Sequence, residues 1–220
     1  MDPSGNKTSL GVDEVVSILQ EVASLIEAEK DDLTRIDAAI GDGDHGVAMA
    51  RGFREISNRL PQWSGLSVGD LFKKVGMTLL SVVGGATGPL FATIFIEAGK
   101  AVEEKTEIEV EDLARMFRAA SNGITARTGA KVGDKTLLDA LHPAALALEK
   151  AAENRLGLKR ALNKAMQAAW DGVQSTKPLM AKHGKSRYLG ERAVGYQDAG
   201  ATSIYLILKA MDEWAEKNIQ

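Results

Sequence analysis

The sequence predicts an all-α protein made of eight antiparallel helices in an up-and-down helical barrel. Apolar residues recur at intervals of three and four over most of the chain, as they do along one face of a helix. The segments between these runs are short and rich in Gly, which favours antiparallel packing of neighbouring helices. With 220 residues, 45% of them hydrophobic, the chain is long enough for one well-packed core.

Local start and stop signals divide the chain into its expected helices. Ser67 with Asp70, and Thr106 with Glu109, resemble capping boxes at helix starts, and Pro61 ends the second helix. The expected ranges are 12–26, 47–60, 67–82, 89–102, 106–124, 134–148, 158–173 and 200–217.

Composition excludes several classes of function. The net charge of −3 provides no basic surface for nucleic acid, and no apolar run is long enough to cross a membrane. The polar start of the chain lacks the apolar centre of a signal peptide, and the absence of Cys fits a cytoplasmic protein. We expect a flexible N-terminus over residues 1–8 and one helical domain over residues 9–220.

The stretch from Ile36 to Gly46 concentrates the chemistry of the chain. Asp37, Asp42 and Asp44 supply three carboxylates and His45 an imidazole, too much charge to bury without a cation. Glycines between them allow a tight turn that aims the carboxylates at one point. Carboxylates without thiolates suit a hard cation such as Mg²⁺, which completes its shell with water and phosphates. The stretch therefore predicts a metal and phosphate site on a Gly-rich loop.

Other interpretations of this stretch are weaker. Gly41, Gly43 and Gly46 match a dinucleotide fingerprint, but two variable positions are Asp and no βαβ pattern surrounds them. An EF-hand would need Glu where Phe53 stands. A polar turn with solvated acids stays open as an alternative.

Four Gly-rich loops are expected to share one end of the barrel. Counting helices as alternately up and down places the loops at 41–46, 84–88, 127–136 and 197–200 together. Helix N-termini then gather beside the acidic residues, and their free N–H groups favour anions. The basic run from Lys182 to Arg192 is either a solvated face or a surface that docks a partner or covers the site.

Several segments resemble the ADP-binding L subunit of dihydroxyacetone kinase. The resemblance begins at Gly41-Asp42-Gly43-Asp44-His45-Gly46 and continues at Gly84-Gly85-Ala86-Thr87-Gly88. It returns at Gly133-Asp134-Lys135-Thr136 and at Gln197-Asp198-Ala199-Gly200-Ala201-Thr202-Ser203. The segments occur in the family's order and span nearly the whole chain.

The resemblance implies a site for ADP or ATP with two Mg²⁺ ions at one end of the barrel. The metal ligands would be Asp37, Asp42 and Asp44, and no side chain would act as a covalent nucleophile. The nucleotide would contact His45, Gly46, Val47, Ala48, Ala86, Thr87, Thr128, Leu137, Lys185, Asp198, Ala199 and Gly200.

Three of these positions depart from the family pattern. Thr128 replaces Gly, Leu137 replaces Met, and Lys185 replaces Arg, which removes a bidentate donor. These changes concern the selectivity for the nucleotide rather than the metal site.

The implied reaction is phosphoryl transfer to a ketose held by a separate K subunit, so we expect activity only with that partner. The phosphoryl group would come from a phosphoprotein of the sugar phosphotransferase system that recharges bound ADP, or from exchanging ATP. The ketose, dihydroxyacetone or a four-carbon relative, and a homodimer are left open. A metal-dependent phosphohydrolase and a non-catalytic cation-binding module are the alternatives from other classes.

Overall fold

The computed structural model describes residues 7–63 and 65–219, and these residues are almost entirely helical. Nine α-helices and one pair of two-residue strands form within them, which confirms the all-α prediction. The elements are β1 (Leu10–Gly11), α1 (Val12–Ala28), α2 (Lys30–Ile40), α3 (His45–Arg59), η1 (Leu60–Trp63), α4 (Val68–Val82), α5 (Thr87–Lys100), β2 (Glu107–Ile108), α6 (Val110–Thr128), α7 (Leu138–Glu153), α8 (Leu158–Ser175), η2 (Lys185–Ala193) and α9 (Ala199–Asn218).

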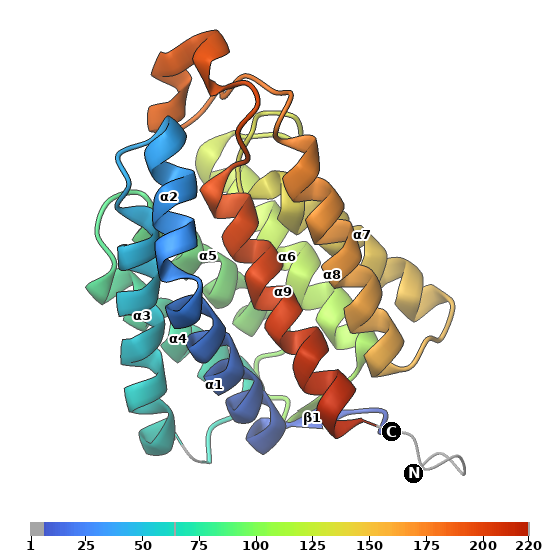
Figure 1. Cartoon of the computed structure of the whole chain (residues 1–220). Helices are drawn as coiled ribbons and strands as arrows, with labels where there is room; N and C mark the ends of the chain where they lie inside the picture. The colour runs from blue at the N-terminus through green and yellow to red at the C-terminus, as the bar shows by residue number, and fades with distance from the viewer. Residues whose placement is uncertain (1–6, 64, 220) are drawn as a thin grey trace.

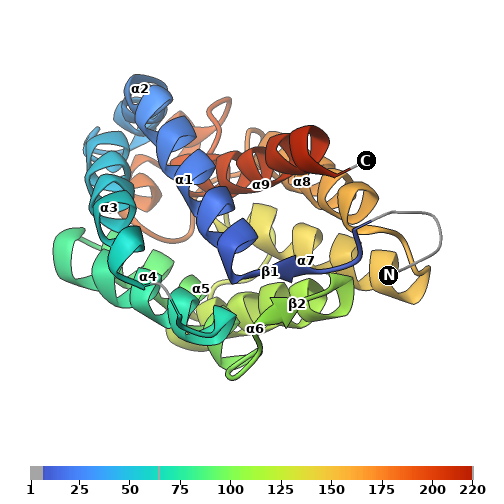
Figure 2. The ribbon, with the colours of Figure 1, turned by 90° about the horizontal axis from the view of Figure 1, so that it is seen from below.

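The helices close into a ring. From α3 to α9 each helix packs against the next in the chain, and α1 packs against both α3 and α9. Figure 2 shows this ring from one end, with α2 lying beyond α1 and beside α3. Because α2 continues α1, the ring among the described residues has the eight members that the periodicity predicts.

The apolar faces of the helices fill the interior of the ring. Phe53, Leu71 and Phe91 are among the largest side chains that are fully buried. The face predicted for the first helix is correct, since Val15, Leu19, Val22 and Ile26 are all buried. The hydrophobic effect thus closes the barrel with one contiguous core.

The first helix differs from the prediction because it extends to Ile40 with an interruption at Glu29. Glu29 has φ −90° and ψ 6°, yet its N–H still bonds the carbonyl of Leu25, at 2.9 Å. No Gly or Pro marks this position in the sequence. The bend allows the start of α2 to pack closely on Gly46 of α3, which is a tertiary requirement.

Of three predicted helix starts, one is confirmed and two are corrected. The Ser67 cap is confirmed by its hydroxyl, which accepts the N–H of Asp70 at 3.1 Å. The cap of α6 instead uses Asp112, whose carboxylate accepts the N–H of Glu109 at 3.0 Å, so Thr106 lies outside it. Asp134 does not begin the sixth predicted helix, because α7 starts at Leu138.

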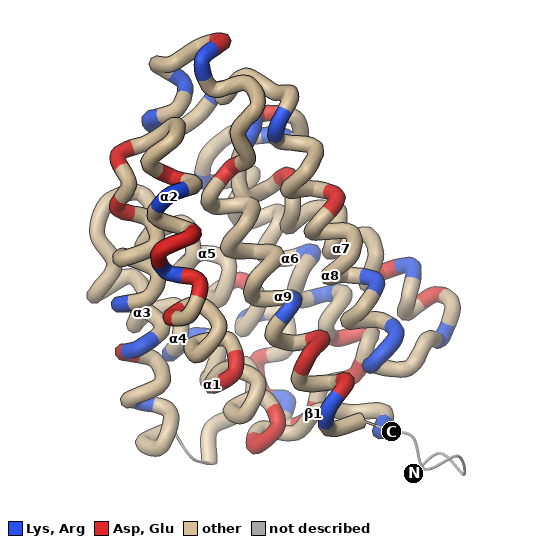
Figure 3. The backbone as a smooth tube through the Cα atoms, in the orientation of Figure 1, with Lys and Arg blue, Asp and Glu red and all other residues tan. Residues whose placement is uncertain are grey.

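β1 and the last turn of α9 lie at the end of the barrel opposite η2 (Figure 1). Residues 1–6 of the expected flexible terminus lie outside the described residues, and the ammonium group of Lys7 pairs with Glu14. Over residues 7–63 and 65–219, no helix has the length and apolarity needed to span a membrane. In the view of Figure 3, positions of Lys and Arg are interspersed with positions of Asp and Glu along the described backbone.

Candidate functional site: an acidic cluster at the mouth of the barrel

A pocket of about 530 Å³ opens at one end of the barrel, beneath η2. Its lining comes from the end of α2 and from the loops before α3, α5, α7 and α9. The prediction that the Gly-rich loops share one end is therefore confirmed. The up-and-down topology produces this arrangement, because every second loop returns to the same end.

Three carboxylates meet at the edge of this pocket. One oxygen each from Asp37, Asp42 and Asp44 lies within 4.8 Å of the other two. Asp37 projects from the last turn of α2, whereas Asp42 and Asp44 belong to the loop that follows, so the cluster is only partly on a loop. Gly43 between them has φ 73°, a conformation that a residue with a side chain rarely adopts. Three convergent hard oxygen ligands, partly exposed, fit Mg²⁺ with remaining positions for water and phosphate.

Lys185 supplies the positive charge at this cluster. Its ammonium group forms an ion pair with Asp42, across 143 positions in the sequence. The hydrogen bond from Lys185 holds the pKa of Asp42 below its ordinary value, and the same contact raises the pKa of Lys185. Both side chains are exposed, so water and salt screen the attraction and a cation can replace it.

Helix N-termini face the same pocket. α3 begins at His45, α5 at Thr87 and α9 at Ala199, and all three residues line the pocket. The N-cap positions of α3 and α5, Asp44 and Ala86, make no side-chain capping bond. The N–H of His45 donates to Oδ2 of Asp37 at 3.3 Å, so the other N–H groups of these first turns, with the helix dipoles, favour an anion such as a phosphate beside the metal ligands.

Each ring nitrogen of His45 lies within hydrogen-bond distance of a hydroxyl group. Nε2 lies 2.8 Å from the hydroxyl of Ser203 on α9, and Nδ1 lies 3.4 Å from the hydroxyl of Thr87. Burial lowers the pKa of His45, although the charges of Asp37 and Asp44 oppose that effect. The ring is therefore neutral near pH 7, fixed between three helices.

Asp198 closes the pocket from the other side. Its carboxylate accepts the N–H of Ala201 at 2.7 Å and so caps α9, as the Asp-Ala-Gly sequence allows. Burial raises the pKa of Asp198 to about 7, against the opposing effect of the bond from Ala201. The carboxyl group of Asp198 therefore keeps its proton at mildly acidic pH.

Most of the predicted site residues line this one pocket. They are Asp37, Asp42, Asp44, His45, Ala86, Thr87, Thr128, Leu137, Lys185, Asp198, Ala199 and Gly200. Gly46, Val47 and Ala48 do not line it: Gly46 and Ala48 are buried, and the side chain of Val47 points to solvent. These three residues form the first turn of α3, where only their backbone could approach a phosphate, so their role stays a prediction.

Other residues of the pocket are not among the predicted site residues. They include the polar residues Arg127, Lys135, His183 and Ser186. His183 and Ser186 lie in the basic run, whose position over the pocket depends on the path of the chain between α8 and α9. Lys135 belongs to a segment that carried the resemblance, yet its neighbours in space come from residues 176–196.

Comparison with known proteins identifies the family of this chain. A family profile described as the DAK2 domain matches residues 39–213. The chain is 39% identical over 203 residues to the PEP-dependent dihydroxyacetone kinase, ADP-binding subunit DhaL, of Escherichia coli, covering 92% of this chain and 97% of that one. It is 33% identical to the PTS-dependent dihydroxyacetone kinase, ADP-binding subunit DhaL, of Lactococcus lactis, covering 93% and 98%.

Solved structures show the same fold. The dihydroxyacetone kinase of C. freundii in complex with AMP-PNP and Mg²⁺ matches with a TM-score of 0.71 and 28% identity. The match covers 97% of this chain but 36% of the other, so this chain corresponds to about a third of that kinase. The profile over most of the chain and the high coverage of the subunits establish that this protein belongs to the DAK2 domain family and resembles DhaL-type ADP-binding subunits.

Proposed function

We propose that this chain is the nucleotide-binding subunit of a dihydroxyacetone kinase. It would hold ADP or ATP with two Mg²⁺ ions and transfer the phosphoryl group to a ketose on a separate K-type subunit. The observation that carries the proposal is the convergence of Asp37, Asp42 and Asp44 within 4.8 Å beside the N-termini of α3 and α5, whose N-cap side chains make no capping bond. The names of the relatives, which include ADP-binding subunits, support the same assignment.

The pocket would bind the phosphates of the nucleotide at its charged edge and the adenine ring against its apolar wall. At the charged edge, the first turns of α3 and α5 would bind phosphate oxygens through backbone N–H groups. The buried residues Ile124, Ala130 and Leu137 also line the pocket and would pack against an adenine ring. When bound, Mg²⁺ would offset the charge that develops as the phosphoryl group departs.

The hydroxyl contacts and the burial of His45 favour phosphoryl transfer to a partner over hydrolysis. A phosphohydrolase would need a general base that reaches a water molecule. Both nitrogens of His45 lie near hydroxyl groups, and the ring is 7% exposed, so it is poorly placed to activate water. The chain would thus keep a bound nucleotide intact until an acceptor hydroxyl enters from the open end.

The metal and nucleotide site is tested by titration with Mg-ADP in a calorimeter. We expect binding by the parent that EDTA abolishes, and a loss of about a hundredfold in affinity for Asp44→Asn, because one charged ligand is removed. Asp31→Asn is a matched control, since Asp31 lies exposed on α2 outside the pocket. Parental affinity in folded Asp42→Asn and Asp44→Asn variants would refute the proposal.

A second measurement distinguishes the two phosphoryl donors. Retention of one ADP per chain through gel filtration, without turnover on added ATP, indicates recharging by a phosphotransferase-system phosphoprotein. Exchange of ADP and turnover with ATP plus a K-type subunit indicate an ordinary ATP-dependent kinase. The cytoplasmic location and a homodimer stay predictions.

A further inference from the structure

Lys135 is a buried cation with an unusual set of partners. Its side chain is fully enclosed, and the residue is 2% exposed. Nζ lies within hydrogen-bond distance of four backbone carbonyl oxygens, which share its three N–H groups: those of Thr176 at 2.9 Å, Leu179 at 3.1 Å, Ala193 at 2.7 Å and Tyr196 at 2.6 Å. Burial lowers the pKa of Lys135 and the charge of Asp198 opposes that effect, so Asp198 and these carbonyl dipoles together compensate the ammonium group.

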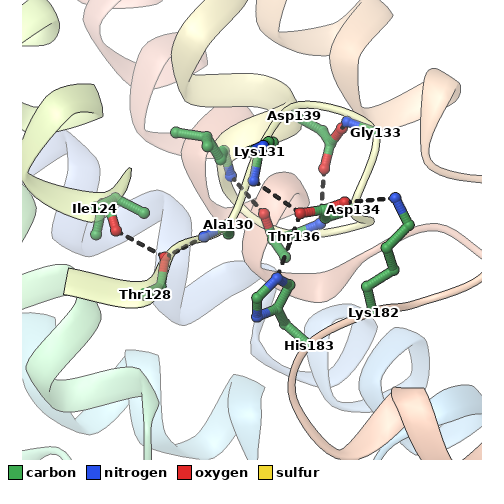
Figure 4. A network of polar contacts seen from close by, with 11 residues as sticks. Ile124, Thr128, Ala130, Lys131, Gly133, Asp134, Thr136, Asp139, Lys182 and His183 are labelled. Carbon is green, nitrogen blue, oxygen red and sulfur yellow. Dashed lines mark hydrogen bonds and ion pairs between the residues drawn. The ribbon is translucent and has the colours of Figure 1, made fainter. Parts of the chain in front are cut away.

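The neighbouring residue, Asp134, binds the middle of the same segment. Its carboxylate accepts from the ammonium group of Lys182 at 2.7 Å and lies 3.3 Å from Nε2 of His183 (Figure 4). Its backbone carbonyl accepts the N–H of Lys182 at 3.1 Å. The contact with Lys182 lowers the pKa of Asp134, so the carboxylate is charged at neutral pH.

The backbone of Lys135 has an energetically unfavourable conformation. Lys135 has φ 59°, in the left-handed region, which costs a residue with a side chain about 1 kcal/mol or more. Such a conformation persists only where the surroundings determine it. Here it lets two successive side chains reach the same segment, Lys135 near its two ends and Asp134 at its centre.

This segment, residues 176–197, covers the pocket. His183, Gly184, Lys185 and Ser186 line the pocket, and Lys185 pairs with Asp42. The N–H of Asp198 at its end bonds the hydroxyl of Thr176, at 3.0 Å. The segment has few apolar anchors of its own, since Met180, Tyr188 and Val194 are exposed, so polar bonds must hold it.

We propose that Asp134 and Lys135 are positioning residues that fasten residues 176–197 over the pocket and thereby slow the departure of the nucleotide. The second half of this statement rests on the proposed function, and the first does not. The role differs from that of Lys185, which faces the metal cluster, because Lys135 acts on the backbone that carries Lys185.

Limited digestion with trypsin tests the fastening without any nucleotide. Lys182, Lys185 and Arg187 are exposed cleavage sites within the segment. We expect Lys135→Met to be cleaved there at least tenfold faster than the parent, because the apolar replacement keeps the bulk but loses all four bonds. Lys131→Met is the control, since Lys131 is exposed on the same loop and bonds Asp134 through its backbone N–H and carbonyl rather than its side chain. Equal cleavage rates in the parent and in Lys135→Met would overturn the proposal.

The rate of ADP dissociation in Mg²⁺, measured by displacement of a fluorescent ADP analogue, tests the second half. We expect it to rise about tenfold in Lys135→Met, with helical content unchanged by circular dichroism, and to stay parental in Lys131→Met. Fast cleavage with a parental dissociation rate would refute the positioning role, whereas a parent that binds no ADP would refute the proposed function instead. If Lys135→Met does not fold, Asp134→Asn, which retains the four bonds of Lys135, must show the same two changes on a smaller scale.

Discussion

Nε2 of His45 and Oγ of Ser203 lie 2.8 Å apart and join α3 to α9 across 158 positions of the sequence. Both residues are buried, and His45 follows Asp44 of the acidic cluster directly in the chain. The contact therefore fixes the ring of His45, the residue at which the first turn of α3 begins.

Ser203→Ala is expected to destabilise the fold by about 1–3 kcal/mol, because it leaves a buried ring nitrogen without its partner. Urea denaturation measures this change. Ser24→Ala, at an exposed position on α1, should stay within about 0.5 kcal/mol of the parent. A Ser203→Ala variant as stable as Ser24→Ala would show that the contact contributes nothing to stability.

Gly46→Ala is expected to cost about 1–3 kcal/mol by overpacking. A Cβ at Gly46 would overlap the carbonyl oxygen of Lys30 and lie 2.6 Å from the backbone nitrogen of Thr34, where α3 meets α2. Gly84→Ala is the matched control, since a Cβ there meets nothing within 4 Å. Thermal unfolding of both variants compares them, and equal melting temperatures would contradict the close approach of α2 and α3.

Asp198→Asn should reduce the dependence of stability on pH. The pKa of Asp198 is about 7 in the folded protein and about 3.9 in an unfolded chain, so between these values only the folded protein holds the proton. The free energy of unfolding therefore falls as pH rises from about 4 to about 7. Asn keeps the cap on Ala201 but does not titrate, so this fall, on the order of a few kcal/mol, should disappear.

Urea denaturation at several pH values in buffer without Mg²⁺ measures that fall. Asp171→Asn, exposed on α8, is the control and should follow the parent. The same slope in Asp198→Asn as in the parent would mean that this carboxyl group is ionised throughout the range.

Lys185→Ala should have opposite effects on metal and nucleotide. Without nucleotide, Mn²⁺ would bind the acidic cluster more tightly, because the ammonium group no longer occupies Asp42. Mg-ADP should bind about tenfold more weakly at low salt, since a positive charge near the phosphates is lost, and the difference should shrink at high salt. Calorimetry of both ligands measures this, with Arg187→Ala, whose side chain lies against Tyr188, as the control. A decrease in both affinities would contradict the competition at Asp42.

Local sequence patterns determined much of this protein. Helical periodicity predicts the buried faces because a helix repeats every 3.6 residues whatever it packs against. The cluster of Asp37, Asp42 and Asp44 was visible because the three ligands lie within eight positions and Gly43 permits the turn. The alternation of up and down helices predicted which loops meet, since that depends only on counting.

Contacts between distant segments were decided by the tertiary structure. The interruption at Glu29 follows from the fit of Gly46 against Lys30, and no residue type at position 29 signals it. Asp134 has the sequence context of a helix cap, yet it binds Lys182, because a side chain takes the partner that the folded chain brings near. The carbonyls that surround Lys135 come from backbone positions, which any sequence possesses, so only the path of residues 176–197 could reveal them.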